Sequence, residues 1–187
     1  MNSMFAKCIS LEEINISHFK TSSLTDMSKM FYNCQKLRTI NLSNLKILPN
    51  NLKGMFENCH NLKIIEGLSK LNTSEVTDMS EMFSFCNSLS EIDLLNFNTS
   101  SVKNMSFMFY GVLSEIIDVT NFKTSLVEDM SFMFAKELHD GFPEKEQKII
   151  GLTNFDTSKV TSMKSMFVLS KGLSSLDLSR FTVFQRN

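Results

Sequence analysis

The chain has 187 residues, with 19 Lys and Arg against 20 Asp and Glu, so its formal net charge is −1. This balance argues against nucleic acid or an anionic membrane as the main partner, because both attract a basic excess. No apolar run approaches the roughly 18 residues that a membrane-spanning helix needs, and the length is sufficient for one hydrophobic core. The abnormal feature is 13 Met and 17 Phe beside no Trp and two Tyr.

An internal repeat explains this composition. The dipeptide Met-Phe recurs at intervals of 25 to 27 residues, with a last interval of 33, and a second Met usually stands three residues before it. We therefore interpret the Met residues as adaptable core packing rather than as ligands of a soft metal ion. The repeated pairs begin at Met4, Met30, Met55, Met82, Met108, Met133 and Met166.

The first half of each unit has the spacing of a short amphipathic helix. In the first full copy, apolar residues at i, i+3, i+6, i+7 and i+10 run from Leu24 to Cys34 and predict one buried stripe of about three turns. Thr21-Ser22 precedes the stripe and can cap the first amides, and Asp26 lies where the helix dipole favours negative charge. Such helices are marginal alone, so we expect stacking to hold them.

The second half of each unit alternates apolar and polar residues. Leu37–Leu42, Leu89–Leu94 and Leu173–Leu178 each predict a short strand with one buried face. Identical units can bury both their faces only by stacking side by side. The sequence therefore predicts a single α/β domain over residues 1–187, a right-handed leucine-rich-repeat-type solenoid of about seven coils, each with a short parallel strand and a short helix.

Three copies depart from the pattern. The third copy lacks Thr-Ser, carries Pro49 and places Gly67 in its strand. The sixth has extra charged, Gly- and Pro-containing residues, which predict a protruding loop at about 137–148. The chain opens inside a predicted helix and stops soon after Phe181, and neither end resembles the polar cap of a solenoid. We therefore expect a fragment, a truncated gene product or a chain that associates end to end.

The most regular unit runs from Val76 to Ser100 and reads Val-Thr-Asp-Met-Ser-x-Met-Phe-x-x-Cys-x-x-Leu-x-x-Ile-Asp-Leu-x-x-Phe-x-Thr-Ser. It resembles the repeat of BspA-like leucine-rich-repeat surface proteins, and the resemblance covers essentially the whole chain. The resemblance implies a cell-surface or secreted protein that acts in adhesion, host-protein binding or cell–cell contact. Because the chain shows no signal peptide, an intracellular, cytoplasmic scaffold or inhibitor stays open as the alternative.

The cysteines and histidines show no catalytic or metal-binding pattern. Cys8, Cys34, Cys59 and Cys86 share one repeat position, and their spacing matches no zinc motif. We interpret them as a column of small buried residues, with a disulfide between neighbouring coils left open. The three His stand at different repeat positions. The prediction is a non-enzymatic protein with no cofactor and no metal ligands.

A partner is expected on the open face of the sheet, where the residues that alternate with the buried ones would gather. We hypothesise that this acidic and polar face contacts a protein partner, with a cation bridging Asp93 and Asp118; the alternative is a solvated face. The resemblance implies that this partner is a host or extracellular-matrix protein. Its central column reads Asn15, Asn41, Gly67, Asp93, Asp118, Gly151 and Asp177. The candidate contact residues are Glu13, Asn15, Thr39, Asn41, Glu91, Asp93, Asp118, Thr120 and Asp177.

Overall fold

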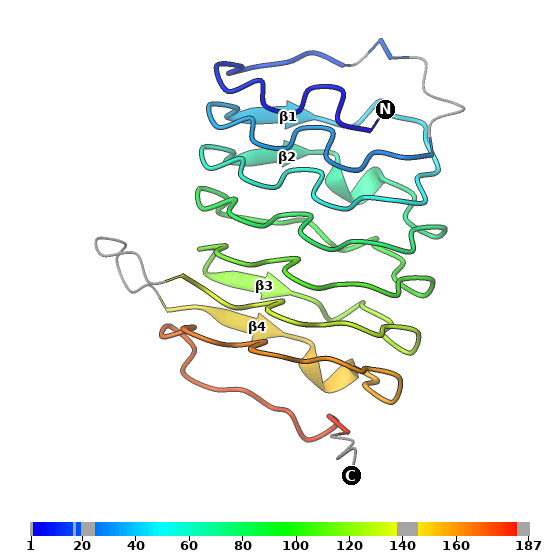
Figure 1. Ribbon diagram of the computed structural model, residues 1–187, viewed down its shortest axis with the longest axis vertical. Helices are drawn as coiled ribbons and strands as arrows, with labels where there is room; N and C mark the ends of the chain where they lie inside the picture. The colour runs from blue at the N-terminus through cyan, green and yellow to red at the C-terminus, as the bar shows by residue number, and fades with distance from the viewer. Residues whose placement is uncertain (1, 17, 20–24, 138–145, 183–187) are drawn as a thin grey trace.

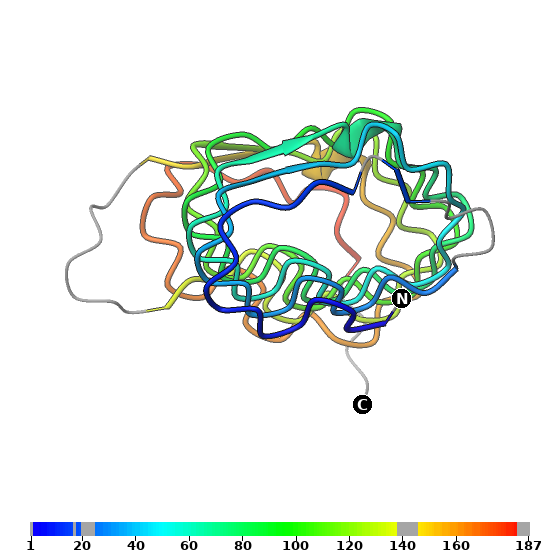
Figure 2. The ribbon, with the colours of Figure 1, turned by 90° about the horizontal axis from the view of Figure 1, so that it is seen from above.

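The computed structural model of the chain describes residues 2–16, 18–19, 25–137 and 146–182. The chain winds through successive coils that lie one above the other, with the first and last described residues toward opposite ends of the stack (Figure 1). Seen along the stack, each coil has two long sides: one carries the strands and is called the sheet side below, and the other carries the Met-Phe segments and is called the turn side (Figure 2). The helix start predicted at Thr21-Ser22 lies outside the described residues.

The sheet side contains short parallel strands, each of three residues. Strand β1 pairs with β2, and β3 pairs with β4. In β1 and β3 the middle residues, Ile40 and Ile117, are buried and their neighbours are exposed, which is the predicted alternation. The strands are β1 (Thr39–Asn41), β2 (Ile64–Glu66), β3 (Ile116–Asp118) and β4 (Lys148–Ile150).

The central column of the sheet side differs from the predicted one at two coils. The prediction put Gly67 and Gly151 in this column, but the observed register puts the preceding residue there. The observed pairs are Asn41 with Glu66 and Asp118 with Ile150.

One extra residue in each of these two coils causes the shift. It stands between the strand and the next buried apolar position and is absorbed by a 3-10 helix, η1 (Leu68–Lys70) or η2 (Leu152–Asn154). Each helix follows a left-handed glycine, with φ of 70° at Gly67 and 97° at Gly151. Glycine adopts that conformation without the steric cost of a Cβ. A one-residue insertion is therefore accommodated without disturbing the next coil.

The Met-Phe segments are not helical. The described residues contain no α-helix, and the amides of these segments divide between two kinds of acceptor. Alternate amides donate to the next coil, as Phe31 N does to Met55 O at 2.9 Å, and the amides between them donate three residues back, as Met30 N does to Met27 O at 3.2 Å. The predicted short helices are replaced in the described residues by this ladder of turns, called the turn ladder below.

The turn ladder directs the same apolar residues toward the core as the predicted helix would. Residues with positive φ recur every four residues, as at Lys29 and Asn33, so that successive turns return to the same side of the chain. An isolated three-turn helix is marginal, whereas here half of the amides find carbonyl partners in the neighbouring coil. In the first full copy the described positions predicted to be buried are buried: Met27, Met30, Phe31 and Cys34. The prediction is wrong at Cys8, which is exposed, and at Leu173–Leu178, where no strand forms and Leu176 and Leu178 are each 38% exposed.

The core is organised around the Phe residues of the Met-Phe pairs. Their rings stack from coil to coil with centroids 5.5 to 6.1 Å apart and interplanar angles of 4° to 12°. This arrangement confirms the predicted column of Phe side chains, called the Phe ladder below, which is buried except at its half-buried end members Phe5 and Phe167. It runs through Phe5, Phe31, Phe56, Phe83, Phe109, Phe134 and Phe167.

The predicted loop at about 137–148 extends too far toward the C-terminus. Residues 138–145 lie outside the described residues, but Gln147 is buried and Lys148 begins β4. The Gln147 side-chain amide donates to Ser114 O at 2.8 Å and to Val112 O at 3.2 Å. Because these bonds pair the buried amide with backbone carbonyls, Gln147 belongs to the packed coil and not to the loop.

Candidate functional site

The nine predicted contact residues are all exposed and lie on the sheet side or just beyond the strand ends. Four of them also shape the backbone, because a side-chain oxygen accepts a hydrogen bond from the amide two residues later. These bonds join Asn41 to Ser43 at 2.8 Å, Asp93 to Leu95 at 3.3 Å, Asp118 to Thr120 at 2.9 Å and Asp177 to Ser179 at 3.0 Å.

The hypothesis of a cation between Asp93 and Asp118 gains no support from the geometry. The Asp93 carboxylate accepts a hydrogen bond from the Ser69 hydroxyl as well as from Leu95 N. Within the described residues, no group of three or more His, Cys, Asp or Glu side chains is placed to hold a metal ion. The observed role of the Asp93 and Asp118 carboxylates is to accept backbone hydrogen bonds that stabilise turns.

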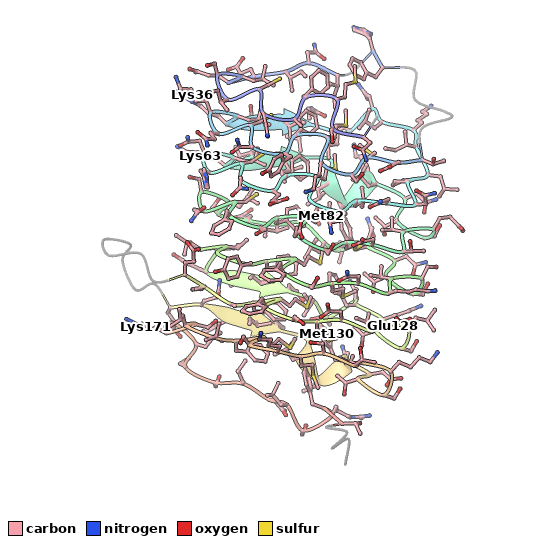
Figure 3. All side chains as sticks on the ribbon, in the orientation of Figure 1. Lys36, Lys63, Met82, Glu128, Met130 and Lys171 are labelled. Atoms are coloured by element: carbon pink, nitrogen blue, oxygen red, sulfur yellow. The ribbon has the colours of Figure 1, made fainter. Side chains whose placement is uncertain are left out.

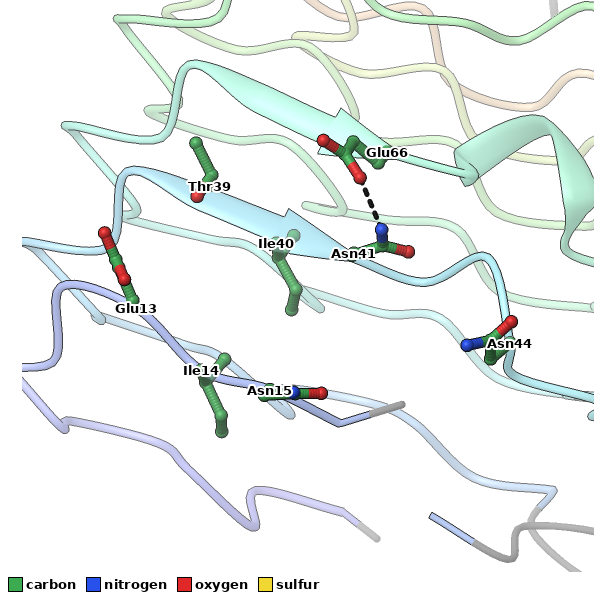
Figure 4. Close-up of a pocket in the computed structure, with 8 residues that line it drawn as sticks. All are labelled: Glu13, Ile14, Asn15, Thr39, Ile40, Asn41, Asn44 and Glu66. Carbon is green, nitrogen blue, oxygen red and sulfur yellow. Dashed lines mark hydrogen bonds between the residues drawn. The ribbon is translucent and has the colours of Figure 1, made fainter. Parts of the chain in front are cut away.

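A depression of about 420 Å³ lies over the first coil and β1 (Figure 4). It brings together four of the predicted contact residues, Glu13, Asn15, Thr39 and Asn41. Its other lining residues are Ile14, Ile40, Asn44 and Glu66. The depression is therefore walled by carboxylates, amides and a hydroxyl, with aliphatic carbon below them.

A break in the sheet produces this depression. Arg38 N donates to Glu12 O at 3.1 Å, and beyond that bond no backbone hydrogen bond joins described residues 13–16 to residues 39–42. On its other edge β1 is fully paired with β2. The Asn41 side-chain amide donates to the Glu66 carboxylate across that paired edge (Figure 4). The first coil therefore diverges from β1, which is held in place by β2.

The sheet side is less polar than the sequence suggested. We predicted an acidic and polar face, but four large aliphatic side chains are exposed there. A signal for three of them was present: two adjacent Ile in a strand point to opposite faces, so one of each pair must face outward. The exposed side chains are Ile64 at 51%, Leu95 at 69%, Ile116 at 52% and Ile150 at 43%.

The turn side carries a cluster of half-buried carboxylates, Glu57 and Glu81. Lys29 Nζ lies 3.8 Å from Glu57 Oε2, and Lys53 Nζ lies 3.6 Å from Glu81 Oε1. Burial raises the pKa of Glu57 to about 7, and the neighbouring Glu81 adds to this rise while the lysines oppose it. Sequence reasoning missed the cluster because its members come from different coils.

An aromatic cluster also lies on the turn side. Phe107 stacks on Phe132 with centroids 4.6 Å apart, and Tyr110 meets Phe85 edge-on at 5.0 Å. All four side chains are half-buried, and the three Phe have φ of 56° to 58°. Bulky residues rarely adopt this left-handed conformation, which the turn ladder imposes at these positions. These Phe lie outside the repeat positions that the sequence analysis assigned.

The cysteines confirm the predicted column in part. Cys34, Cys59 and Cys86 are buried, Cys8 is exposed, and all four are free thiols. Each buried thiol donates to the carbonyl of a Phe in the preceding coils, as Cys59 Sγ does to Phe31 O at 3.1 Å. Burial raises the pKa of Cys34 to about 11 and those of Cys59 and Cys86 further. These thiols are therefore packing groups rather than nucleophiles.

Comparison with known proteins identifies a family but no characterised relative. No curated protein and no solved structure matches the chain. In the described part of the chain, no helix has the length and apolar character needed to cross a bilayer. One family model matches three times, at residues 1–63, 50–142 and 118–186, as expected for a repeated unit. The chain therefore belongs to the family described as "Mycoplasma protein of unknown function, DUF285".

Proposed function

We propose that the chain is a non-enzymatic protein-binding repeat module whose sheet side contacts a partner protein. The observation that carries this proposal is the exposure of large aliphatic side chains at several coils of an otherwise polar face. Ile64, Ile116 and Ile150 belong to strands and stand beside carboxylates of the same face. Large exposed apolar side chains with a polar surround are typical of protein-contact surfaces.

We infer that the architecture is a right-handed leucine-rich-repeat-type solenoid related to BspA-like surface proteins. Parallel pairing of strands from successive coils, the continuous Phe ladder and the three overlapping family matches support this inference. Solenoids present a long surface because each coil adds one row of side chains to it. A module of this shape suits adhesion, host-protein binding or cell–cell contact.

An intracellular scaffold or inhibitor is the second candidate. It is favoured by the state of the cysteines, since Cys8, Cys34, Cys59 and Cys86 are all free thiols. Secreted domains of modest size often pair their cysteines, whereas reducing compartments keep thiols free. The two candidates share the same binding surface and differ in the source of the partner.

The test starts with the purified chain immobilised and exposed separately to extracellular-matrix proteins and to a cytosolic extract. A captured protein is then purified and its dissociation constant for the chain is measured directly. We expect Ile64→Asp with Ile116→Asp to weaken binding about tenfold or more. Leu126→Asp is the matched control, because Leu126 is 37% exposed and lies in a turn outside the strands. Equal loss in the control, or none in the double variant, would refute the sheet side as the contact surface.

A further inference from the structure

We propose that the depression over the first coil and β1 seats an arginine side chain from an extended segment of the partner protein. The inference rests on the proposed function and specifies its chemistry at one place on the sheet side. It follows from three properties of the depression: its acceptors, its unpaired negative charge and its aliphatic floor.

The acceptors are arranged around the depression. Glu13 and Thr39 lie at one end of it, and Asn44 lies at the other, with Asn15 and Asn41 between them (Figure 4). A guanidinium group carries five N–H donors in a planar fork and has no acceptor. Carboxylate, amide and hydroxyl oxygens can accept several of those hydrogen bonds at once. The ammonium group of lysine has fewer donors and would use fewer of these acceptors.

The negative charge at the depression has no basic partner within the described residues. The ion pairs of the described chain join Lys29 to Glu57, Arg38 to Glu12 and Lys53 to Glu81. Neither Glu13 nor Glu66 takes part in them, and Glu66 receives only the neutral amide of Asn41.

No lysine or arginine of the described residues lines the depression. Lys36 and Lys63 project from the edge where the coils enter the sheet side (Figure 3). An incoming cation would therefore meet two carboxylates with no lysine or arginine of the described chain paired to them.

The aliphatic floor of the depression can contact the methylene stem of the arginine, and the gap between the first coil and β1 can accommodate its backbone. Ile40 is buried and Ile14 is half-buried beneath the polar rim, so they can pack against the methylene stem. The volume of about 420 Å³ exceeds one side chain and leaves room for flanking residues. Ile64, which pairs with Thr39 and is 51% exposed, offers an apolar contact beside the depression for a neighbouring residue of the same segment.

The experiment measures binding of a fluorescent peptide, Gly-Ser-Arg-Ser-Gly with an apolar residue added on one side, to the full chain by anisotropy. The same peptide with Lys or citrulline in place of Arg, and free arginine, serve as comparison probes. We expect saturable binding of the Arg peptide, at least fivefold weaker binding of the Lys peptide and none of the citrulline peptide.

Variants place the binding at the depression. Glu13→Gln with Glu66→Gln should weaken the Arg peptide about tenfold, and Asn44→Asp should tighten it, because the charge opposing the guanidinium changes in opposite directions. Glu75→Gln with Glu115→Gln is the matched control, since both residues are exposed acids of later coils outside the depression. Less than a twofold change is expected there.

Four results would overturn the inference: no saturable binding of the Arg peptide, equal binding of the citrulline peptide, equal loss in the control variant, or free arginine binding as tightly as the peptide. If any of these occurs while the partner still depends on Ile64 and Ile116, the proposed function stands and only the arginine site falls. Loss of the Ile64 and Ile116 effect with an intact arginine site would instead refute the wider contact surface.

Discussion

Gly67 lies against the backbone of Ser43 in the preceding coil: a Cβ at Gly67 would come within 2.6 Å of Ser43 Cα. The glycine also has φ of 70°. The absence of a Cβ is therefore required both by the close contact with Ser43 and by the left-handed backbone conformation. Gly67 lies between β2 and the 3-10 helix η1, which absorbs the extra residue of its coil. The contact shows how closely successive coils approach at the strand ends.

Replacing Gly67 by Ala should destabilise the protein. We expect the free energy of unfolding to fall by about 2 kcal/mol or more, because the new methyl group meets backbone atoms and the left-handed conformation becomes strained. Urea unfolding followed by circular dichroism measures the change. Gly172→Ala is the control, since Gly172 is not among the residues with positive φ, and its effect should stay within about 1 kcal/mol. Similar losses in both variants would contradict this account.

The Phe ladder should respond strongly to truncation in its middle. Phe83→Ala removes a fully buried ring that stacks on Phe56 and Phe109, and we expect a loss of about 3–5 kcal/mol in unfolding free energy. Leu95→Ala, at a side chain that is 69% exposed, should change it by less than about 0.5 kcal/mol. Chemical denaturation of both variants provides the comparison, and a small loss for Phe83→Ala would show that the stack contributes little.

The carboxylate cluster on the turn side should make stability depend on pH. Because the pKa of Glu57 rises from 4.5 in the unfolded chain to about 7 in the folded one, folding favours its protonated form. Its contribution is therefore present at low pH and is lost as pH rises from about 4.5 to about 7.

Glu57→Gln should remove this dependence. Relative to the unmodified chain, the variant should gain about 1 kcal/mol at pH 8 and nothing at pH 4, a value reduced for solvent screening. Melting temperatures measured across this range give the difference. Glu75→Gln, at an exposed residue, is the control. A gain that is the same at both pH values would contradict the assignment to Glu57.

The thiols should differ sharply in reactivity. Cys8 is exposed, whereas Cys34, Cys59 and Cys86 are buried and their pKa values are raised by that burial. We expect a thiol reagent at pH 8 to modify one equivalent rapidly in the native protein and four in urea. The Cys8→Ser variant should lose the fast equivalent. Rapid modification of more than one thiol in the native state would mean that the buried cysteines are accessible to the reagent, contrary to this prediction.

The carboxylate at the start of the turn ladder should act through its geometry rather than its charge. Asp78 Oδ1 accepts from Ser80 N at 2.8 Å, and Asn51 and Asn104 make the same bond in the flanking coils. Asp78→Asn should therefore change the unfolding free energy by less than about 0.5 kcal/mol, and Asp78→Ala should lower it by about 1 kcal/mol. A charge-based role, as a helix dipole would need, predicts a loss in both variants.

The sequence determined most of the buried positions, with exceptions at Cys8, Leu176 and Leu178. The repeated spacing that runs from Met27 to Cys34 depends only on which residues are apolar, and each copy repeats it, so the Phe ladder could be predicted from one chain. The strand alternation around Ile40 was recognisable for the same reason. For the candidate site, the pattern named Glu13, Asn15, Thr39 and Asn41, which the structure brings together at one depression.

The tertiary structure decided how the backbone satisfies that burial. A helix and a turn ladder place Met27, Met30 and Phe31 on the same side, so the apolar spacing could not distinguish them. The difference lies in the hydrogen-bond partners, since Phe31 N finds Met55 O in another coil. The register that puts Glu66 beside Asn41, and the break between the first coil and β1, also depend on contacts between residues about 25 positions apart. The local spacing of apolar residues indicates which side chains are buried. The hydrogen-bond pairing between coils depends on contacts between residues that are distant in the sequence.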